Sequence, residues 1–411
     1  MDKPKIRFKG YTDAWEQRKL GDCCDMYNGD RSSKYPNADD MVSDGIPFIN
    51  AGDLENGTVN LMTCNRITRE KYNDLGGAKL QRGDIVYCLR GTLGKNAFID
   101  NFDEGTVASS LVALRPKNIG GKYLHFIINS DIEYRQRIVR NEGAAQPNLS
   151  AKSVSEYIIP VPSEAEQQQI SAYFSRLDTL ITLHQRKCEE VKKLKKYMLQ
   201  NMFPRNGSNV PEIRFDGFTN AWEQRKLSEL SDSFEYGLNA AAKEFDGENK
   251  YIRITDIDDA SHEFNVDDVT SPDIDLANAG NYKLAEGDIL FARTGASVGK
   301  TYIYKASDGL VYYAGFLIRA RIKKEYNPEF VFQNTLTADY EKYIAVTSQR
   351  SGQPGVNAQE YSEYKIMVPG KEEQDKISAY LGSLDHLITL HQRKCEKLQN
   401  IKKFMLQNMF V

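Results

Sequence analysis

The chain has 411 residues, of which 40% are hydrophobic and 27% charged, and this composition is typical of a globular protein with several domains. Its 54 lysines and arginines stand against 57 aspartates and glutamates, so the net charge of −3 excludes a globally basic nucleic-acid binder and leaves only local basic patches. The opening residues MDKPKIRFKG contain no apolar signal region, and no run of about 18 apolar residues occurs. We therefore expect neither secretion nor a membrane span.

The cysteines follow no metal-ligand spacing, and the five histidines form no cluster. We expect reduced thiols, a cytoplasmic location and no bound metal. The cysteines are Cys23, Cys24, Cys64, Cys88, Cys188 and Cys395.

The first segment of the chain is repeated in its second half. Residues 6–20 (IRFKGYTDAWEQRKL) return as residues 213–227 (IRFDGFTNAWEQRKL), shifted by 207 and identical at 12 of 15 positions. The two tryptophans of the chain, Trp15 and Trp222, are equivalent in this alignment. The chain is therefore an internal duplication.

Each repeat continues into a head whose short β-branched and aromatic runs, bounded by Gly, Asn and Asp, predict strands in an α+β fold. The heads have diverged, but weak anchors remain. Residues 46–49 (IPFI) resemble 251–254 (YIRI), and 83–86 (GDIV) resemble 287–290 (GDIL). A constant frame with variable heads suggests one task performed twice on two different targets.

Glycine-rich turns follow the Gly-Asp strands: Arg90–Lys95 (RGTLGK) resembles Arg293–Lys300 (RTGASVGK). A phosphate-binding loop would need its first glycine at Thr294, so we do not expect nucleotide binding. The pattern predicts a strand–turn–strand with glycines at positive φ. Alternatively, the turn presents its arginine and lysine to a duplex phosphate or a guanine edge.

Three other patterns carry no predicted chemistry. Asn327-Pro328 is better explained as a helix cap followed by proline at the first helical position than as a methyltransferase motif. Glu363-Tyr364-Lys365 has no suitably placed acidic partner for a nuclease site. Residues 256–275 hold eight acids and fit no calcium loop, so we expect a solvated face turned away from DNA.

Polar loops early and late in each head carry Arg, Lys, Asn and Gln, the side chains that make bidentate contacts to base edges. Ordinary solvated loops remain the alternative interpretation of each of them. The candidate DNA-binding residues are Arg31, Ser32, Ser33, Lys34, Arg90, Lys95, Gln146, Asn148, Asn239, Lys243, Arg293, Lys300, Gln349, Arg350, Gln353 and Asn357.

Each repeat ends in a long amphipathic segment, Glu164–Phe203 and Lys371–Phe410, with 26 of 40 positions identical. Apolar residues recur at heptad spacing in both copies and predict two helices of about 60 Å. Neither helix can bury its stripe alone, so we expect the two to pack antiparallel about an approximate dyad. The predicted organisation is head 1–160, helix 161–203, linker 204–212, head 213–367 and helix 368–411.

The frame resembles the specificity subunit of type I restriction–modification systems. The residues that carry the resemblance are the Ile159–Pro162 and Val368-Pro369 segments, the Glu-Gln pairs 166–167 and 373–374, the Leu-Asp pairs 177–178 and 384–385, the Gly-Asp-Ile strands, residues 143–150 and the doubled WEQRKL. The resemblance implies two target recognition domains, each reading half of a split DNA sequence, and two antiparallel spacer helices. It also implies a chain without catalysis of its own.

The resemblance further implies binding of double-stranded DNA, two modification (methyltransferase) subunits and restriction subunits. S-adenosylmethionine, ATP and magnesium would belong to those partners, with no cofactor in this chain. The alternative is a coiled-coil scaffold whose heads bind proteins. The helix residues expected to contact partners are Leu177, Leu180, Ile181, Leu384, Leu387 and Ile388.

Overall fold

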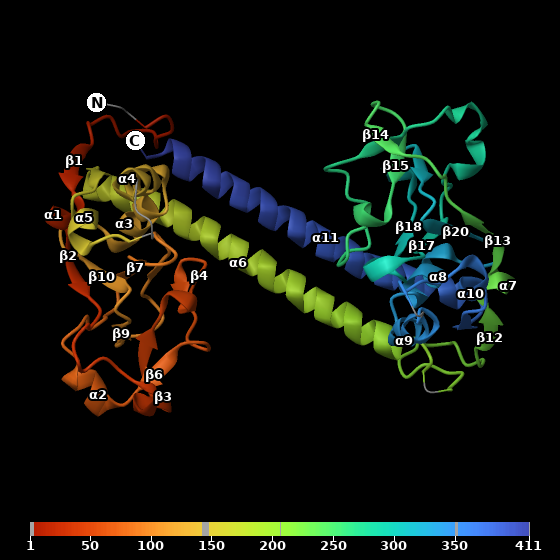
Figure 1. The fold of residues 1–411 in the computed structure, drawn as a ribbon, viewed down its shortest axis with the longest axis horizontal. Coiled ribbons are helices and arrows are strands. Elements are labelled where there is room, and N and C mark those ends of the chain that lie inside the picture. The colour runs from red at the N-terminus through yellow and green to blue at the C-terminus, as the bar shows by residue number, and fades with distance from the viewer. Residues whose placement is uncertain (1–3, 142–147, 206, 350–351, 411) are drawn as a thin grey trace. The chain divides into compact units, whose positions relative to one another are not determined.

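The computed structural model describes residues 4–141, 148–205, 207–349 and 352–410, and the chain divides into two compact units. The first unit comprises the chain up to His184 together with the segment from Lys394 onward, and the second comprises Gln185–Arg393. The long helices α6 (Glu164–Asn201) and α11 (Lys371–Asn408), visible in Figure 1, therefore each contribute one part to each unit.

The first unit is built around a four-stranded antiparallel main sheet in the order β2-β10-β7-β8. A smaller sheet, β6-β3-β9, the hairpin β4-β5 and the pair β1-β11 complete its strands. The strands are β1 (Glu16–Lys19), β2 (Cys24–Asn28), β3 (Met41–Ile49), β4 (Leu54–Glu55), β5 (Thr58–Val59), β6 (Asn65–Ile67), β7 (Ile85–Cys88), β8 (Asn96–Phe98), β9 (Thr106–Val107), β10 (Leu111–Pro116) and β11 (Ile158–Val161). The shorter helices are α1 (Leu20–Cys23), α2 (Arg69–Asp74), α3 (Gly121–Ile128), α4 (Asp131–Asn141) and α5 (Ala151–Ser155).

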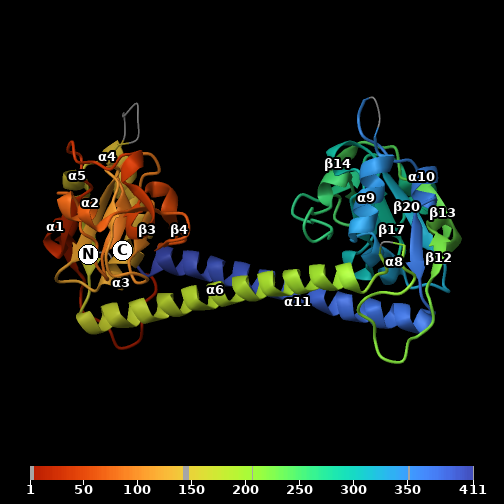
Figure 2. The same ribbon diagram turned by 90° about the horizontal axis from the view of Figure 1, so that it is seen from below.

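The second unit repeats this plan with the main sheet β13-β20-β17-β18, the second sheet β14-β16-β15-β19 and the pair β12-β21. Figure 2 shows helix α9 beside this main sheet, where Tyr340 packs 6.5 Å from Phe291. The strands are β12 (Glu223–Lys226), β13 (Ser231–Tyr236), β14 (Ala242–Glu244), β15 (Lys250–Ile252), β16 (Thr270–Pro272), β17 (Ile289–Ala292), β18 (Thr301–Ile303), β19 (Val311–Tyr313), β20 (Leu317–Ile322) and β21 (Lys365–Val368). The shorter helices are α7 (Leu227–Leu230), α8 (Pro328–Asn334), α9 (Ala338–Thr347) and α10 (Ala358–Ser362).

The Gly-Asp anchors have the same structural role in both units. The buried Asp84 carboxylate receives two hydrogen bonds from Arg115, at 2.9 and 2.8 Å, just before β7 begins. Asp288 receives the same pair from Arg321, at 2.9 and 2.8 Å, before β17. A buried carboxylate that lost its partner would carry a large desolvation cost, so this pair fixes the start of the central strand.

The second anchor is displaced by two residues from the sequence alignment. Phe48 and Ile49 pair in parallel with β9 as Tyr251 and Ile252 pair with β19, so Ile49 corresponds to Ile252. The expected match of 46–49 with 251–254 is therefore wrong in register. Both strands run into a short helical turn that ends in a buried aspartate, and this turn fixes the register.

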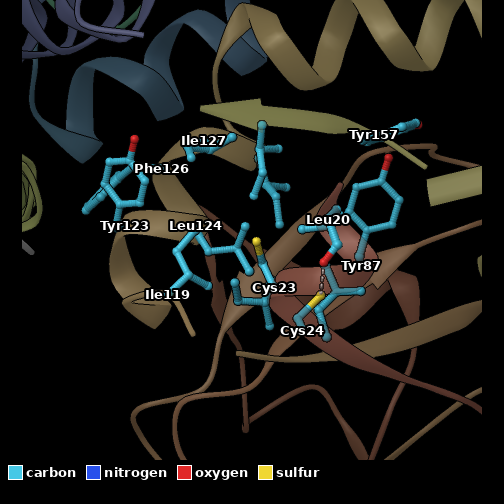
Figure 3. Packing of buried hydrophobic residues seen from close by; sticks show 14 of the residues in the cluster. Leu20, Cys23, Cys24, Tyr87, Ile119, Tyr123, Leu124, Phe126, Ile127 and Tyr157 are labelled. Carbon is cyan, nitrogen blue, oxygen red and sulfur yellow. Dashed lines mark hydrogen bonds between the residues drawn. The ribbon is translucent and has the colours of Figure 1, made fainter. Parts of the chain in front are cut away.

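The core of the first unit joins α1, the main sheet and α3, as Figure 3 shows for Leu20 and Cys23 of α1, Tyr87 of β7 and Leu124 of α3. The residues just after α11 close this core: the ring of Phe410 stacks on Phe174 of α6, with a centroid distance of 5.9 Å. Four residues further along α6, Asp178 accepts a hydrogen bond of 2.5 Å from Lys402. Residue numbers thus fall along α11 as they rise along α6, so the helices run antiparallel here.

The second unit contains the matching arrangement. Phe203, just after α6, packs on Phe330 and Trp222 with centroid distances of 5.4 and 6.2 Å. Lys195 donates to Asp385 at 2.6 Å, and these two residues are the repeat equivalents of Lys402 and Asp178. Within each unit the helices are antiparallel, as the heptad pattern predicts.

The helices begin at Glu164 and Lys371, where the two amphipathic segments begin. The first residues of the broader ranges 161–203 and 368–411, Val161 and Val368, instead end strands β11 and β21. The predicted N-terminal cap of the following helix is confirmed for α8, where the Asn327 side chain accepts from the Phe330 amide at 3.1 Å and proline opens the helix. In the described ranges, no helix is both long and apolar enough to cross a membrane.

Candidate nucleic-acid interface

One end of each main sheet collects most of the predicted DNA-contact residues. Because neighbouring strands are antiparallel, the ends of β2 and β7 and the starts of β10 and β8 lie at the same edge. The ends of β13 and β17 and the starts of β20 and β18 share an edge in the second unit. We call this edge, with the turns attached to it, the rim. The first rim comprises 28–34, 90–95, 109–110 and 148; the second comprises 236–239, 293–300, 315–316 and 353–357.

The first rim joins segments that are far apart in the sequence. The Arg31 guanidinium donates to the Ser109 carbonyl oxygen from Nε at 3.3 Å and from Nη2 at 3.2 Å. The Arg90 Nε donates to the Asn148 side-chain oxygen at 3.2 Å. Arg31, Arg90 and Asn148 are all exposed. Two guanidinium groups are thus held at the rim by one partner each and keep N–H groups that face solvent.

The loop of Arg31 is ordered by a buried carboxylate. Asp30 accepts from the backbone amides of Ser32 and Gly76, both at 2.7 Å, and hydrogen bonding to Ser32 lowers the pKa of Asp30. Lys34 donates to the Asp74 carboxylate at 2.5 Å, and this exposed hydrogen bond raises the pKa of Lys34. These residues line an open groove of about 710 Å³, which also contains Ser33.

The second rim carries aromatic side chains. The Arg293 guanidinium lies over the Tyr236 ring, 5.0 Å from its centroid, and its Nη1 donates to the Gly315 carbonyl at 3.5 Å. The Tyr236 hydroxyl accepts from the Ala358 amide at 3.2 Å. The preceding residue, Asn357, caps α10 by accepting from the Glu360 amide at 2.9 Å. The candidates Arg293 and Asn357 thus lie on either side of an exposed tyrosine.

The structure corrects the pairing of the two turn arginines. The Leu89 amide donates to the Ser110 carbonyl, and the Arg293 amide donates to the equivalent Phe316 carbonyl. Arg293 therefore corresponds to Leu89, which is fully buried, and Arg90 corresponds to Thr294. The expected match of Arg90 with Arg293 is wrong by one residue because the Gly-Asp strands align at a shift of 204, which places Leu89 opposite Arg293. The extra residue of the second turn comes later, between Thr294 and Gly299. Successive side chains along a strand point to opposite faces of the sheet. The side chains of Arg90 and Arg293, which are one position apart in this alignment, therefore point in different directions.

The predicted strand–turn–strand is present in both units. The turns place Gly91 and Gly94 at φ of 79° and 80°, and Gly295 and Gly299 at 76° and 87°. These backbone conformations favour glycine. The segment continues into a strand, β8 or β18, and not into the helix that a phosphate-binding loop requires.

The lysines of the two turns point into the protein. Lys95 donates to the Ala51 carbonyl at 2.8 Å, and Lys300 donates to the Ile257 carbonyl at 2.9 Å while pairing with Asp259. Lys300 also lines a cavity of about 850 Å³ next to α9, together with His262, whose pKa burial lowers. Their contact with DNA stays a prediction, but both ammonium groups already have protein partners.

The remaining candidates are spread over several elements. Asn239 follows β13 at the second rim, and Gln353 lies close to Gly295. Lys243 is an exposed residue of β14 in the second sheet, away from the main-sheet edge. Gln349 lies after α9. Gln146 and Arg350 lie outside the described residues.

The predicted partner contacts on the helices divide by burial. Leu177 and Leu384 are 7% and 5% exposed and pack in the cores of their units, and Ile181 is also buried. Leu387 is exposed, whereas Leu180 and Ile388 are half-buried. Partner binding stays a prediction for all six residues. Leu180, Leu387 and Ile388 are the better candidates because part of their side-chain surface is exposed.

Two exposed aromatic residues of the second rim, Tyr236 and Phe316, are missing from the sequence candidates. Sequence alone does not distinguish them from the other 22 tyrosines and 17 phenylalanines. A usable signal exists: residues 107–111 (VASSL) align with 313–317 (YAGFL) through the shared alanine and leucine. This alignment places Phe316 opposite Ser110, where the structure also has it.

The chain matches known proteins over nearly its whole length. Residues 12–193 and 220–400 each match the type I restriction modification DNA specificity domain. The MjaVIII specificity subunit of a type I restriction enzyme from Methanocaldococcus jannaschii is 24% identical over 95% of this chain and 90% of its own length. The HindI specificity subunit of Haemophilus influenzae is 26% identical over 41% of this chain and 36% of its own length.

A solved S subunit of the type I system of M. genitalium has the same fold, with a TM-score of 0.64 at 15% identity, covering 100% of this chain and 99% of that one. Specificity subunits are DNA-recognition components and not enzymes. The two family matches account for the two units and their equivalent rims. The chain belongs to the type I restriction–modification DNA specificity family and carries two copies of its domain.

Proposed function

We propose that the chain is the sequence-reading subunit of a type I restriction–modification complex, and that each rim reads one half of a bipartite, non-palindromic DNA target. One observation carries the proposal: the two rims share a backbone and differ in side chains. Gly29 and Gly237 approach equivalent carbonyls, of Ala108 and Ala314, so closely that a Cβ would lie 2.2 and 2.1 Å away. Two residues later the first rim has Arg31 and the second has Asn239.

The side chains at the rims fit direct reading of bases. Arginine pairs with the O6 and N7 acceptors of guanine, and asparagine pairs with N6 and N7 of adenine. The first rim offers Arg31 and Arg90, whereas the second has Asn239 and Thr294 at those positions. Unlike side chains on a common scaffold are what two unlike half-sites require.

The helices supply the second part of the proposal, the docking of two methyltransferase subunits. Residues 179–189 are nearly identical to 386–396, so the chain offers two copies of one helical surface. Equivalent surfaces favour two copies of one partner. Restriction subunits would join the same complex. S-adenosylmethionine, ATP and magnesium would act in these partners, and the complex would be cytoplasmic.

The test exchanges the first head. The full chain is expressed with its methyltransferase subunits in a strain that lacks them, and the methylated sequence is mapped across the genome. Replacing residues 21–145 with the corresponding region of another family member should change one half of the methylated sequence and leave the other half intact. The reciprocal exchange in the second head is the matched control and should change the opposite half.

The competing interpretation is a scaffold whose heads bind proteins. It predicts that the assembled complex shows no sequence preference on DNA and no steep loss of affinity with rising salt. An unchanged methylation sequence after both exchanges would also contradict DNA reading by the heads.

A further inference from the structure

The most unusual side chain of the second rim is Phe316, which is 62% exposed at the turn between β19 and β20. Its backbone is held firmly. The Phe316 carbonyl accepts from the Arg293 amide at 3.1 Å, and the Gly315 amide donates to the Leu238 carbonyl at 2.9 Å. The Leu317 amide closes the turn by donating to the Ala314 carbonyl at 2.8 Å. A rigid turn therefore presents an aromatic ring to solvent.

The fold does not require an exposed aromatic ring at position 316. Single exposed apolar residues are common on protein surfaces and need no explanation by themselves. Here the equivalent position of the first unit is Ser110, on a turn with the same hydrogen bond from the neighbouring strand. The scaffold thus accepts a small polar residue at this place, and the phenylalanine is a property of the second rim alone.

The surroundings of Phe316 resemble a nucleic-acid surface. Arg293 is bonded to the carbonyl of Gly315 and stacked on Tyr236, which is 44% exposed. The exposed Asn239 lies next to the same turn, with its Cα 3.7 Å from where a Cβ on Gly315 would be. An apolar ring beside a guanidinium and an amide matches one base pair better than the others. In the major groove, only thymine presents an apolar group, its C5 methyl, and adenine opposite it accepts a bidentate contact from asparagine.

We propose that Phe316 reads the C5 methyl group of a thymine in the half-site bound by the second rim, with Asn239 facing the same or the adjacent A·T pair. The inference rests on the proposed function and adds the base class that this rim recognises. The first rim, with Ser110 and two arginines, has no apolar group at the equivalent position and lacks this methyl contact.

The test removes the methyl group without altering base pairing. The probe is a duplex with the mapped methylation sequence, in which each thymine of the second half-site is replaced singly by deoxyuridine. Binding is measured with the full chain assembled with its methyltransferase subunits. At one position the replacement should weaken binding about four-fold, which corresponds to about 0.8 kcal/mol for one buried methyl group.

The Phe316→Ala variant, measured on both duplexes, tests whether the loss caused by deoxyuridine comes from contact with Phe316. It should bind the thymine duplex about as weakly as the wild type binds the deoxyuridine duplex, and deoxyuridine at that position should cause no further loss. The control is Ile274→Ala, which removes an exposed apolar side chain outside the rim and should leave both affinities unchanged. Because the Phe316 backbone keeps its hydrogen bonds in the variant, a thermal melt should show unchanged stability.

Any one of three results would overturn the inference: a second half-site without thymine, a set of deoxyuridine replacements none of which weakens binding, or a Phe316→Ala variant that keeps the full sensitivity to deoxyuridine. A uniform loss of affinity on all sequences would instead identify Phe316 as a wedge or stacking residue. Failure of the proposed function looks different, because the wild-type complex would then not distinguish the mapped sequence from an unrelated duplex.

Discussion

The ion pair between the half-buried Arg7 and the buried Glu166 ties the start of the chain to α6 and provides the sharpest stability prediction. Glu166 is 1% exposed and accepts from Arg7 Nε and Nη2 at 2.7 and 2.8 Å, with a third hydrogen bond of 3.1 Å from Trp15 Nε1. Arg7→Met removes two of the three donors and leaves a buried carboxylate with one. Breaking such a pair costs about 3–5 kcal/mol.

The matched control is Arg69→Met, which removes an arginine of the same unit from an ion pair with Glu104 in which both side chains are at least half exposed. Exposed pairs of this kind contribute little to stability because solvent screens the two charges. We therefore predict that Arg7→Met lowers the free energy of unfolding several-fold more than Arg69→Met does. This comparison does not depend on the absolute stability of the unit.

The two tryptophans allow each unit to be followed separately. In a Trp222→Phe background, the fluorescence of Trp15 reports the first unit alone. Urea unfolding should then show a midpoint lowered by about 1 M or more for Arg7→Met, given a slope of up to about 3 kcal/mol/M. The control should shift little. If Arg7→Met shifts the midpoint no more than Arg69→Met, the buried pair is not a main support of the first unit.

Three further predictions concern the rim and α3. Arg90→Ala should weaken specific binding by about 1–3 kcal/mol and relax one position of the first half-site, with stability unchanged; equal affinity for all bases before and after would exclude base reading. Lys95→Met should lower the free energy of unfolding by about 1–2 kcal/mol because the Ala51 carbonyl loses its donor. The salt dependence of DNA binding should stay unchanged, and a smaller salt slope would show that the lysine contacts phosphate instead. Burial lowers the pKa of His125 to about 3, below the roughly 6.5 of an unfolded chain, so stability should fall by at most about 2 kcal/mol from pH 7.5 to 5. His125→Phe, which copies the equivalent Phe332, should remove that loss in urea titrations at the two pH values; an unchanged pH dependence would contradict it.

Some features could be predicted from the sequence because they follow from strong, regular patterns. The heptad spacing and near identity of 164–203 and 371–410 were enough to predict two antiparallel helices, and Asn327-Pro328 identified a helix start. These signals are local, or repeat over many residues, and tertiary context does not override them.

The rim could be predicted only in part. Aligning Arg90 with Arg293 matches the chemistry but departs by one residue from the register that the Gly-Asp strands set, and a slip of one along a strand moves a side chain to the opposite face. The inward direction of Lys95 and Lys300 depends on carbonyls of distant loops. The alignment of 107–111 with 313–317 places Phe316 opposite Ser110, but it does not show that the ring faces solvent, because exposure depends on the turn that the neighbouring residues form.

The contribution of residues 394–410 to the first unit has a consequence for synthesis on the ribosome. Met409 and Phe410 close the core around Trp15 and Phe174, but they are translated after the whole of Gln185–Arg393. At about 5–20 residues per second, the nascent first unit waits roughly 10–40 s for its last apolar contacts while residues 185–393 are synthesised. The part of the chain that is made first therefore stays without its last core residues for the longest time, and we expect it to have the greater need of chaperone protection.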